Sequence, residues 1–341
     1  DVYKRQVLKY RSEIMAIATL WITGGHCLSF CSDQWTFLNY FRPVLAYGYG
    51  GVEIFLFLSG VGIALSLSKS PTFMNFVFRR VSRILPAYWI ILTFFYLLIN
   101  GSFRDYFGEF LTLSYWYPLI IGTTGGGSNV TFWYISAAFA FYLLSVPLFP
   151  ILKKYPRTIT SLILLIDISL FYLGIIWCQD TLGRIHLFLA RIPIYFSGLY
   201  VGSKITDIRF NTFTICLISL LTYLILGIGS MVLGGRVITS YGLNFVLLYF
   251  IAPGVIIALA SLFRWMEQRK IGTYLSRSLR YIGKHSLELY LTHIMLIDLM
   301  FRYNTKISFL FFFVASVATA VALKKLASYF LILIKLFSNT L

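Results

Sequence analysis

The sequence reads Phe78-Arg79-Arg80-Val81-Ser82-Arg83-Ile84-Leu85-Pro86 at the start of an apolar run that extends to residue 100. Such a run predicts a helix that crosses a membrane, because a bilayer core takes about 20 apolar residues of helix. The three arginines at its mouth have two explanations. They either anchor the helix at the cytoplasmic face or bind a polyanionic cosubstrate there.

The composition extends the membrane prediction to the whole chain. Of the 341 residues, 59% are hydrophobic and only 12% are charged, and the mean hydropathy is +0.80. A soluble protein of this length cannot bury so much apolar surface, so the composition predicts a polytopic membrane protein. The net charge of +17 does not indicate nucleic-acid binding, because the cations cluster between apolar segments, as the positive-inside rule requires.

Ten apolar segments are long enough to cross a bilayer, and their continuous rather than alternating pattern favours helices over strands. They are residues 14–31, 48–68, 84–100, 131–151, 159–177, 186–203, 211–232, 240–263, 285–303 and 308–332. With the N-terminus inside, the inner gaps hold 22 Lys and Arg and the outer gaps hold 6. This asymmetry predicts an all-α bundle with both termini cytoplasmic. We expect one integral-membrane domain over residues 11–335, preceded by a short cytoplasmic or non-native tail, residues 1–10.

Titratable groups inside the apolar segments indicate a polar cavity, because such groups are expensive in a membrane. They are His26, Arg191, Glu288 and His293. His26 lies about 12 residues, or roughly 18 Å, into the first segment, where an imidazole can take a proton from an attacking hydroxyl. Glu53, near the outer end of the second segment, can orient a histidine or bind a sugar hydroxyl. Hydrogen bonding between helices, or hydration in the case of Glu53, explains the same residues without a function.

The arginines form the second candidate site. Arg80 and Arg83 are three residues apart, so on a helix they share one face. Guanidinium groups bind phosphate and pyrophosphate oxygens through paired hydrogen bonds. Coenzyme A carries a 3′-phosphate and a pyrophosphate, so these residues, assisted by Arg79, fit a clamp for acyl-CoA. Binding of lipid headgroups would explain the same cluster.

The longest connection, about 101–130, is expected on the outer side. Its aromatic residues favour either anchoring at the membrane surface or stacking on a sugar; they include Tyr106, Tyr115, Trp116 and Tyr117. The Gly125–Gly127 triplet predicts a flexible turn rather than a phosphate-binding loop, since no strand precedes it. The four cysteines lack metal-binding spacing, and a disulfide between Cys31 and Cys178 is an open alternative to small apolar packing.

Six stretches, taken in order, resemble the acyltransferase-3 family of integral-membrane O-acyltransferases. They are Ala16 to His26, Gly51 to Gly60, Arg79 to Tyr88, Phe132 to Ile135, Arg191 to Gly198 and Gly283 to His293. The resemblance covers about residues 11–330. The family's opening helix usually carries a basic residue eleven positions before its essential histidine. Here that position is Met15. Arg11 lies one turn before Met15, on a helix face about 60° away from that of His26, and its long side chain could take the place of the missing basic residue.

This resemblance implies a bacterial membrane O-acyltransferase, in the first instance an O-acetyltransferase, in the inner (cytoplasmic) membrane. Acetyl-CoA or another acyl-CoA would be the donor cosubstrate, with no tightly bound cofactor and no metal. The acceptor would be a hydroxyl of an extracytoplasmic glycan or lipid-linked sugar. His26 would act as general base or carry the acyl group transiently, while Glu53, Glu288 and His293 would orient it or line the acceptor path.

Two other functions fit part of the sequence. A transporter or flippase for a polysaccharide or its lipid-linked precursor would explain the polar cavity and the aromatic connection, but not a paired arginine motif beside Pro86. A regulatory protein on a degenerate acyltransferase scaffold is the third alternative. Consumption of acyl-CoA by the purified protein would separate the enzyme from the transporter.

Overall fold

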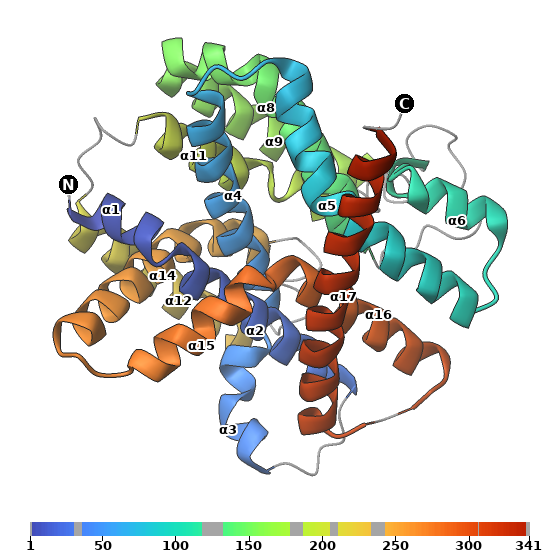
Figure 1. Ribbon diagram of the computed structural model, residues 1–341. Coiled ribbons are helices and arrows are strands. Elements are labelled where there is room, and N and C mark those ends of the chain that lie inside the picture. Colours follow the sequence, from blue (N-terminus) through green and yellow to red (C-terminus); the bar gives the residue numbers. More distant parts are fainter. Residues whose placement is uncertain are drawn as a thin grey trace. The chain divides into compact units, whose positions relative to one another are not determined.

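The computed structural model describes residues 2–30, 36–117, 132–177, 187–204, 211–232, 243–305 and 307–338, and all regular structure within these ranges is helical (Figure 1). The chain divides into two compact units. Unit 1 comprises residues 1–18, 49–70 and 141–283, and unit 2 comprises residues 19–48, 71–140 and 284–341. Each unit is therefore assembled from segments that are distant in the sequence.

Unit 1 is built around two helix pairs, since α11 packs on α4 and α12 packs on α14. Its helices are α1 (Val2–Lys9), α4 (Gly51–Leu67), α9 (Pro156–Trp177), α11 (Ile192–Ser203), α12 (Thr212–Val232), α14 (Leu243–Gln268) and α15 (Thr273–Lys284). The α4–α11 pair meets backbone to backbone: a Cβ added to Gly60 would collide with the carbonyl oxygen of Tyr195, and one added to Gly198 with that of Phe57. Close approach at small residues is typical of helices that pack inside membranes.

Unit 2 contains α5 packed against α16 and α17. Its helices are α3 (Thr36–Leu45), α5 (Phe73–Leu98), α6 (Phe103–Phe110), the short 3-10 turn η2 (Ser114–Trp116), α16 (Ser286–Arg302) and α17 (Phe309–Ser338). A further 3-10 turn, η1 (Gly48–Gly50), has its first residue in unit 2 and the other two in unit 1. Helices α2 (Arg11–Phe30) and α8 (Trp133–Lys154) are divided between the two units, and α15 ends one residue into unit 2.

Local signals explain where several helices begin and end. The Thr72 hydroxyl accepts a hydrogen bond from the Asn75 N–H at 3.3 Å and caps α5. The apolar run had placed the start of this helix at residue 84, but the cap starts it eleven residues earlier, so the arginine cluster is helical. Asn100 follows α5 with φ of 48° and Asn304 follows α16 with φ of 46°, the left-handed conformation that terminates many helices.

The membrane prediction is confirmed in its coarser form. A helix occupies each of the ten expected segments, and within the described ranges six helices are long and apolar enough to cross a bilayer. Large apolar side chains such as Leu220 and Leu221 on α12 and Phe311 on α17 are exposed, as a lipid environment requires. The count of ten spans, the cytoplasmic termini and the single-domain boundaries stay predictions.

The connection after α5 contains regular structure, namely α6 and the turn η2. Helix α6 folds back along α5, where the Trp89 indole N–H donates to the Phe110 carbonyl at 3.0 Å and the hydroxyls of Thr93 and Tyr106 share a hydrogen bond of 3.0 Å. The aromatic side chains at these contacts therefore anchor α6 on α5. The Gly125–Gly127 triplet, Cys31 and Cys178 lie outside the described residues.

Candidate functional site

Unit 2 brings the two predicted histidines together. His26 on α2 and His293 on α16 have ring centroids 5.6 Å apart, with the ring planes inclined at 55°. His293 is fully buried, whereas His26 retains partial exposure. His26 is therefore the imidazole that a substrate can reach, and His293 lies behind it.

The hydrogen bonding of His293 defines its tautomer. Its Nδ1 lies 2.8 Å from the Leu289 carbonyl oxygen, which can only accept, so Nδ1–H donates and the neutral ring keeps its lone pair on Nε2. That Nε2 is buried and has no hydrogen-bond partner among the described residues. A buried, unmatched acceptor beside His26 is available to stabilise a proton that His26 takes up.

The local structure fixes the position of His26 from both sides. Gly24 and Gly25 admit the end of α3 against α2: a Cβ on Gly25 would lie 2.7 Å from the Leu45 carbonyl oxygen. On the other side, Cys27 packs in a buried cluster with residues of α16 and α17 that include Ile297 and Phe312. The glycines before His26 and the cysteine after it therefore hold that turn of α2 in place.

Several polar groups around the histidine pair were not selected from the sequence. The Tyr290 ring lies 5.8 Å from the His293 ring, edge to face. The Thr23 hydroxyl is buried without a hydrogen-bond partner in the described structure and precedes His26 by three residues, on the same helix face. The i, i+3 spacing of both pairs was the available signal, but apolar sequences contain many such pairs.

A buried carboxyl lies on the α5–α6 side of unit 2. The Tyr88 hydroxyl donates to Glu109 Oε2 at 3.0 Å and to the Glu109 carbonyl at 2.8 Å. Burial raises the pKa of Glu109 to about 7, while the Ser114 and Tyr88 hydroxyls lower it and the charge of Asp105 raises it. Glu109 therefore exchanges a proton near neutral pH.

The arginine cluster lies in the first three turns of α5, also in unit 2. At 100° per residue, Arg79, Arg83 and Arg80 fall within an arc of about 100°. Arg79 and Arg83 are exposed and Arg80 is partly buried, with its guanidinium 5.3 Å from the Phe76 ring centroid. The Arg79 Nε–H donates to the Asn75 carbonyl at 3.1 Å, so Arg79 is partly engaged by its own helix.

The predicted glutamates have charged partners of their own. In unit 1, Glu53 Oε1 lies 3.4 Å from Arg191 Nε, and both side chains are 2% exposed. In unit 2, Glu288 Oε2 lies 4.0 Å from Lys324 Nζ. Glu288 and His293 are five residues apart on α16 and so point about 140° away from each other. Their roles in orienting His26 or lining an acceptor path stay predictions.

Arg11, the proposed substitute for the missing basic residue, does not lie near His26. Arg11 opens α2 fifteen residues before His26, about 22 Å along the helix. Its guanidinium lies against α4, where a Cβ on Gly62 would be 3.1 Å from Nη2. Arg11 thus interacts with α4 rather than extending along α2 toward His26.

The donor set favours acid–base chemistry. Within the described ranges no group of three or more His, Cys, Asp or Glu side chains could hold a metal ion. The histidine pair can accept and stabilise a proton, and the arginines can bind a polyanion.

Apolar helices that carry a histidine pair and an arginine-rich turn are compatible with a membrane-embedded group-transfer enzyme. A family model described as an acyltransferase domain matches residues 16–324. The chain therefore belongs to the acyltransferase-3 family and is a multi-pass membrane acyltransferase. Searches of curated proteins and of solved structures found no match.

Proposed function

We propose that the protein is an O-acyltransferase, most simply an O-acetyltransferase, of the bacterial inner membrane. Acyl-CoA binds from the cytoplasmic side, and the acceptor is a hydroxyl of a cell-envelope glycan or lipid-linked sugar. The single observation that carries this proposal is the histidine pair in unit 2, in which an accessible His26 lies beside a buried His293 with an unmatched Nε2.

The reaction requires one proton transfer. His26 takes the proton from the acceptor hydroxyl as the oxygen attacks the thioester carbonyl carbon. The C–O bond forms, the C–S bond breaks, and the coenzyme A thiolate leaves and recovers the proton from His26. The atoms balance as acyl-S-CoA plus R–OH giving acyl-O-R plus HS-CoA, without an oxidant or a metal.

His293 acts through His26 and is a positioning residue. When His26 becomes an imidazolium, its N–H groups have no lone pairs and seek acceptors. The Nε2 of His293 is such an acceptor. Because Nδ1–H donates to the Leu289 carbonyl, the proton of the neutral ring stays on Nδ1 and the lone pair stays on Nε2. Burial strengthens this interaction, because no water competes for it.

The arginines supply the donor site. Three guanidinium groups over about 100° of helix surface match a ligand that carries several phosphate groups. Arg80 and Arg83 would bind the pyrophosphate and the 3′-phosphate of coenzyme A, and Arg79 would assist. The clamp and the histidine pair belong to the same compact unit, which favours one active site for both.

The test is acyl transfer by the purified protein in nanodiscs with radiolabelled acetyl-CoA and extracted lipid-linked sugars. The proposal predicts label in the glycan fraction with wild-type protein and none with His26→Ala. Succinyl-CoA and longer acyl-CoA donors, run in parallel, would identify the acyl group. Absence of any acyl-CoA consumption by folded wild-type protein would refute the proposal.

A further inference from the structure

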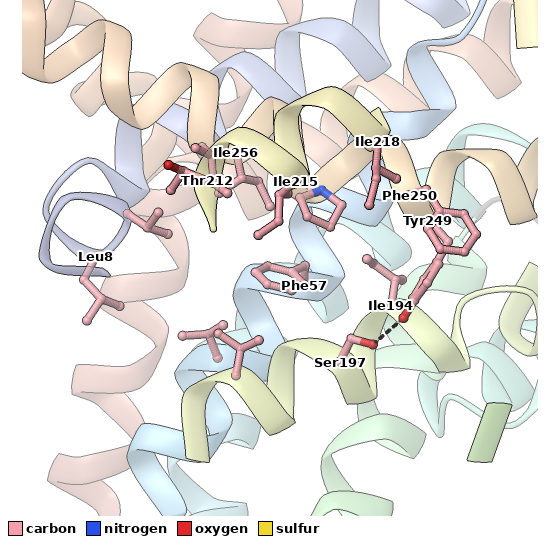
Figure 2. Close-up of a pocket in the computed structure, with 15 residues that line it drawn as sticks. Leu8, Phe57, Ile194, Ser197, Thr212, Ile215, Ile218, Tyr249, Phe250 and Ile256 are labelled. Carbon is pink, nitrogen blue, oxygen red and sulfur yellow. Dashed lines mark hydrogen bonds between the residues drawn. The ribbon is translucent and has the colours of Figure 1, made fainter. Parts of the chain in front are cut away.

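Unit 1 contains a cavity of about 300 Å³ that the transfer chemistry does not use (Figure 2). It lies between the two helix pairs of this unit, α4 with α11 on one side and α12 with α14 on the other, and α1 contributes to its wall. The lining residues of α11 are Ile194, Ser197 and Val201, and those of α12 are Thr212, Ile215 and Ile218. Because these spacings keep to one face of each helix, the cavity is elongated along the helices.

The wall of the cavity is almost entirely apolar. Its few polar groups include the hydroxyls of Ser197 and Tyr249, which share a hydrogen bond of 2.9 Å (Figure 2). This bond satisfies both groups, so a polar metabolite would lose its hydrogen bonds to water without replacement. The wall therefore selects an aliphatic ligand.

The size of the cavity fits one hydrocarbon chain. Its volume is at the lower end of the range for small-molecule pockets. It equals the volume of roughly ten water molecules, and a methylene group is about the size of one water molecule. Along α14 the lining runs from Tyr249 to Ile257, about 12 Å at 1.5 Å per residue. A straight, narrow ligand of this length fills the space better than a compact one.

The cavity is close to lipid and has a cation beyond one end. The opposite face of α12 is exposed and apolar, with Leu220 56% and Leu224 48% exposed, so lipid chains contact the same helix. Lys204 follows Val201 by one turn at the end of α11, and an ammonium group there suits a phosphate headgroup. The apolar length and the terminal cation together match an anionic phospholipid.

We infer that this cavity binds one acyl chain of an anionic membrane phospholipid, with the headgroup near Lys204. The chain fills the gap between the α4–α11 pair and the α12–α14 pair and joins them. This site is separate from the acyl-CoA reaction, so its test does not depend on the proposed function.

The test is photocrosslinking in nanodiscs with phosphatidylglycerol or phosphatidylcholine that carries a mid-chain diazirine, followed by peptide mass spectrometry. We expect adducts on the inward-facing lining residues Ile194, Val201 and Ile256, with phosphatidylglycerol labelling at least fivefold more than phosphatidylcholine. Lys204→Ala should abolish that preference, and the matched change Lys69→Ala should not. Adducts only on residues of the opposite face, such as Leu220 and Leu224, would overturn the inference, as would equal labelling by the two lipids.

Two substitutions test occupancy of the cavity. Ile256→Trp fills it and should lower the adducts about tenfold, whereas Leu220→Trp, on the opposite, exposed face of α12, should leave them unchanged. If Ile256→Trp does not fold, Ile215→Phe provides the same test with a smaller change. Displacement of the label by palmitoyl-CoA, but not by free coenzyme A, would assign the cavity to the donor chain and overturn the inference.

Discussion

The rings of His26 and His293 lie 5.6 Å apart on α2 and α16, two helices that the sequence separates by more than 250 residues. The partly exposed partner, His26, can meet a substrate, and the buried partner, His293, presents an unmatched Nε2. Because the two histidines differ in exposure, we expect their substitutions to change the kinetics in different ways.

His26→Gln should lower kcat by about 10²–10⁴, the usual contribution of a general base, without changing acyl-CoA affinity. His293→Gln should lower kcat less and shift the pH profile of kcat, because it removes the acceptor for the His26 imidazolium. Steady-state kinetics from pH 5.5 to 9 would measure both effects. His285→Gln is the control, and an unshifted profile for His293→Gln would reject its positioning role.

Arg80→Ala and Arg83→Ala should each weaken acyl-CoA binding by roughly 10- to 100-fold, since a hydrogen bond to a charged group contributes about 1.5–3 kcal/mol. Arg79→Ala should have a smaller effect, because its Nε–H already donates to the Asn75 carbonyl. Isothermal titration of acetyl-CoA would compare these proteins with Arg104→Ala, an exposed arginine on α6. Unchanged affinity in the Arg80/Arg83 double variant would exclude the clamp.

The buried carboxyl of Glu109 makes unit 2 sensitive to pH. Burial raises its pKa to about 7 from the model-peptide value of 4.5, so the folded state binds more protons than the unfolded state between these values. The resulting stabilisation is complete below pH 4.5 and is lost as pH rises through 7, a change of about 3 kcal/mol.

Thermal unfolding of wild type and Glu109→Gln between pH 4.5 and 8.5 measures this effect. The wild type should lose stability relative to the variant as pH rises, because glutamine cannot ionise. Parallel pH curves for the two proteins would show that the carboxyl does not titrate in this range.

The Glu53–Arg191 pair, 2% exposed on both sides, should be strongly coupled. Glu53→Gln or Arg191→Met alone should cost about 3–5 kcal/mol, because each leaves a buried charge unpaired. The double variant should recover most of the loss. A double-mutant cycle of unfolding free energies would measure the coupling, and additive effects would contradict it.

Gly60→Ala should destabilise unit 1, because its Cβ would collide with the Tyr195 carbonyl and the α11 backbone. Gly227→Ala on α12 is the matched control, since, apart from the backbone of its own helix, no atom of the described residues lies within 4 Å of the added Cβ and alanine favours a helix by roughly 1 kcal/mol over glycine. Opposite shifts in melting temperature are expected. Equal shifts would mean that α4 and α11 do not pack closely at Gly60.

Hydropathy predicted where the helices lie, because apolar runs reflect the lipid solvent directly. It missed the start of α5, since the cap at Thr72 is a local hydrogen bond within a polar stretch. It also missed that α6 returns along α5, because the contact between Tyr88 and Glu109 depends on tertiary packing.

The sequence predicted which residues belong to the candidate site, but not which of them contact one another. A histidine inside an apolar segment is conspicuous, so both His26 and His293 were selected. Nothing in the sequence indicates that Glu53 pairs with Arg191, because the partners are far apart along the chain and no spacing rule connects them. Thr23 and Tyr290 carry no charge and therefore no such signal.

The buried pair of Glu53 and Arg191 also has a consequence for biosynthesis. The ribosome makes Glu53 138 residues before Arg191, which at about 5–20 residues per second is a delay of roughly 7 to 28 s. During that interval α4 holds a carboxyl group whose partner does not yet exist. This turn of α4 must therefore stay hydrated, protonated or shielded by another protein until α11 is made.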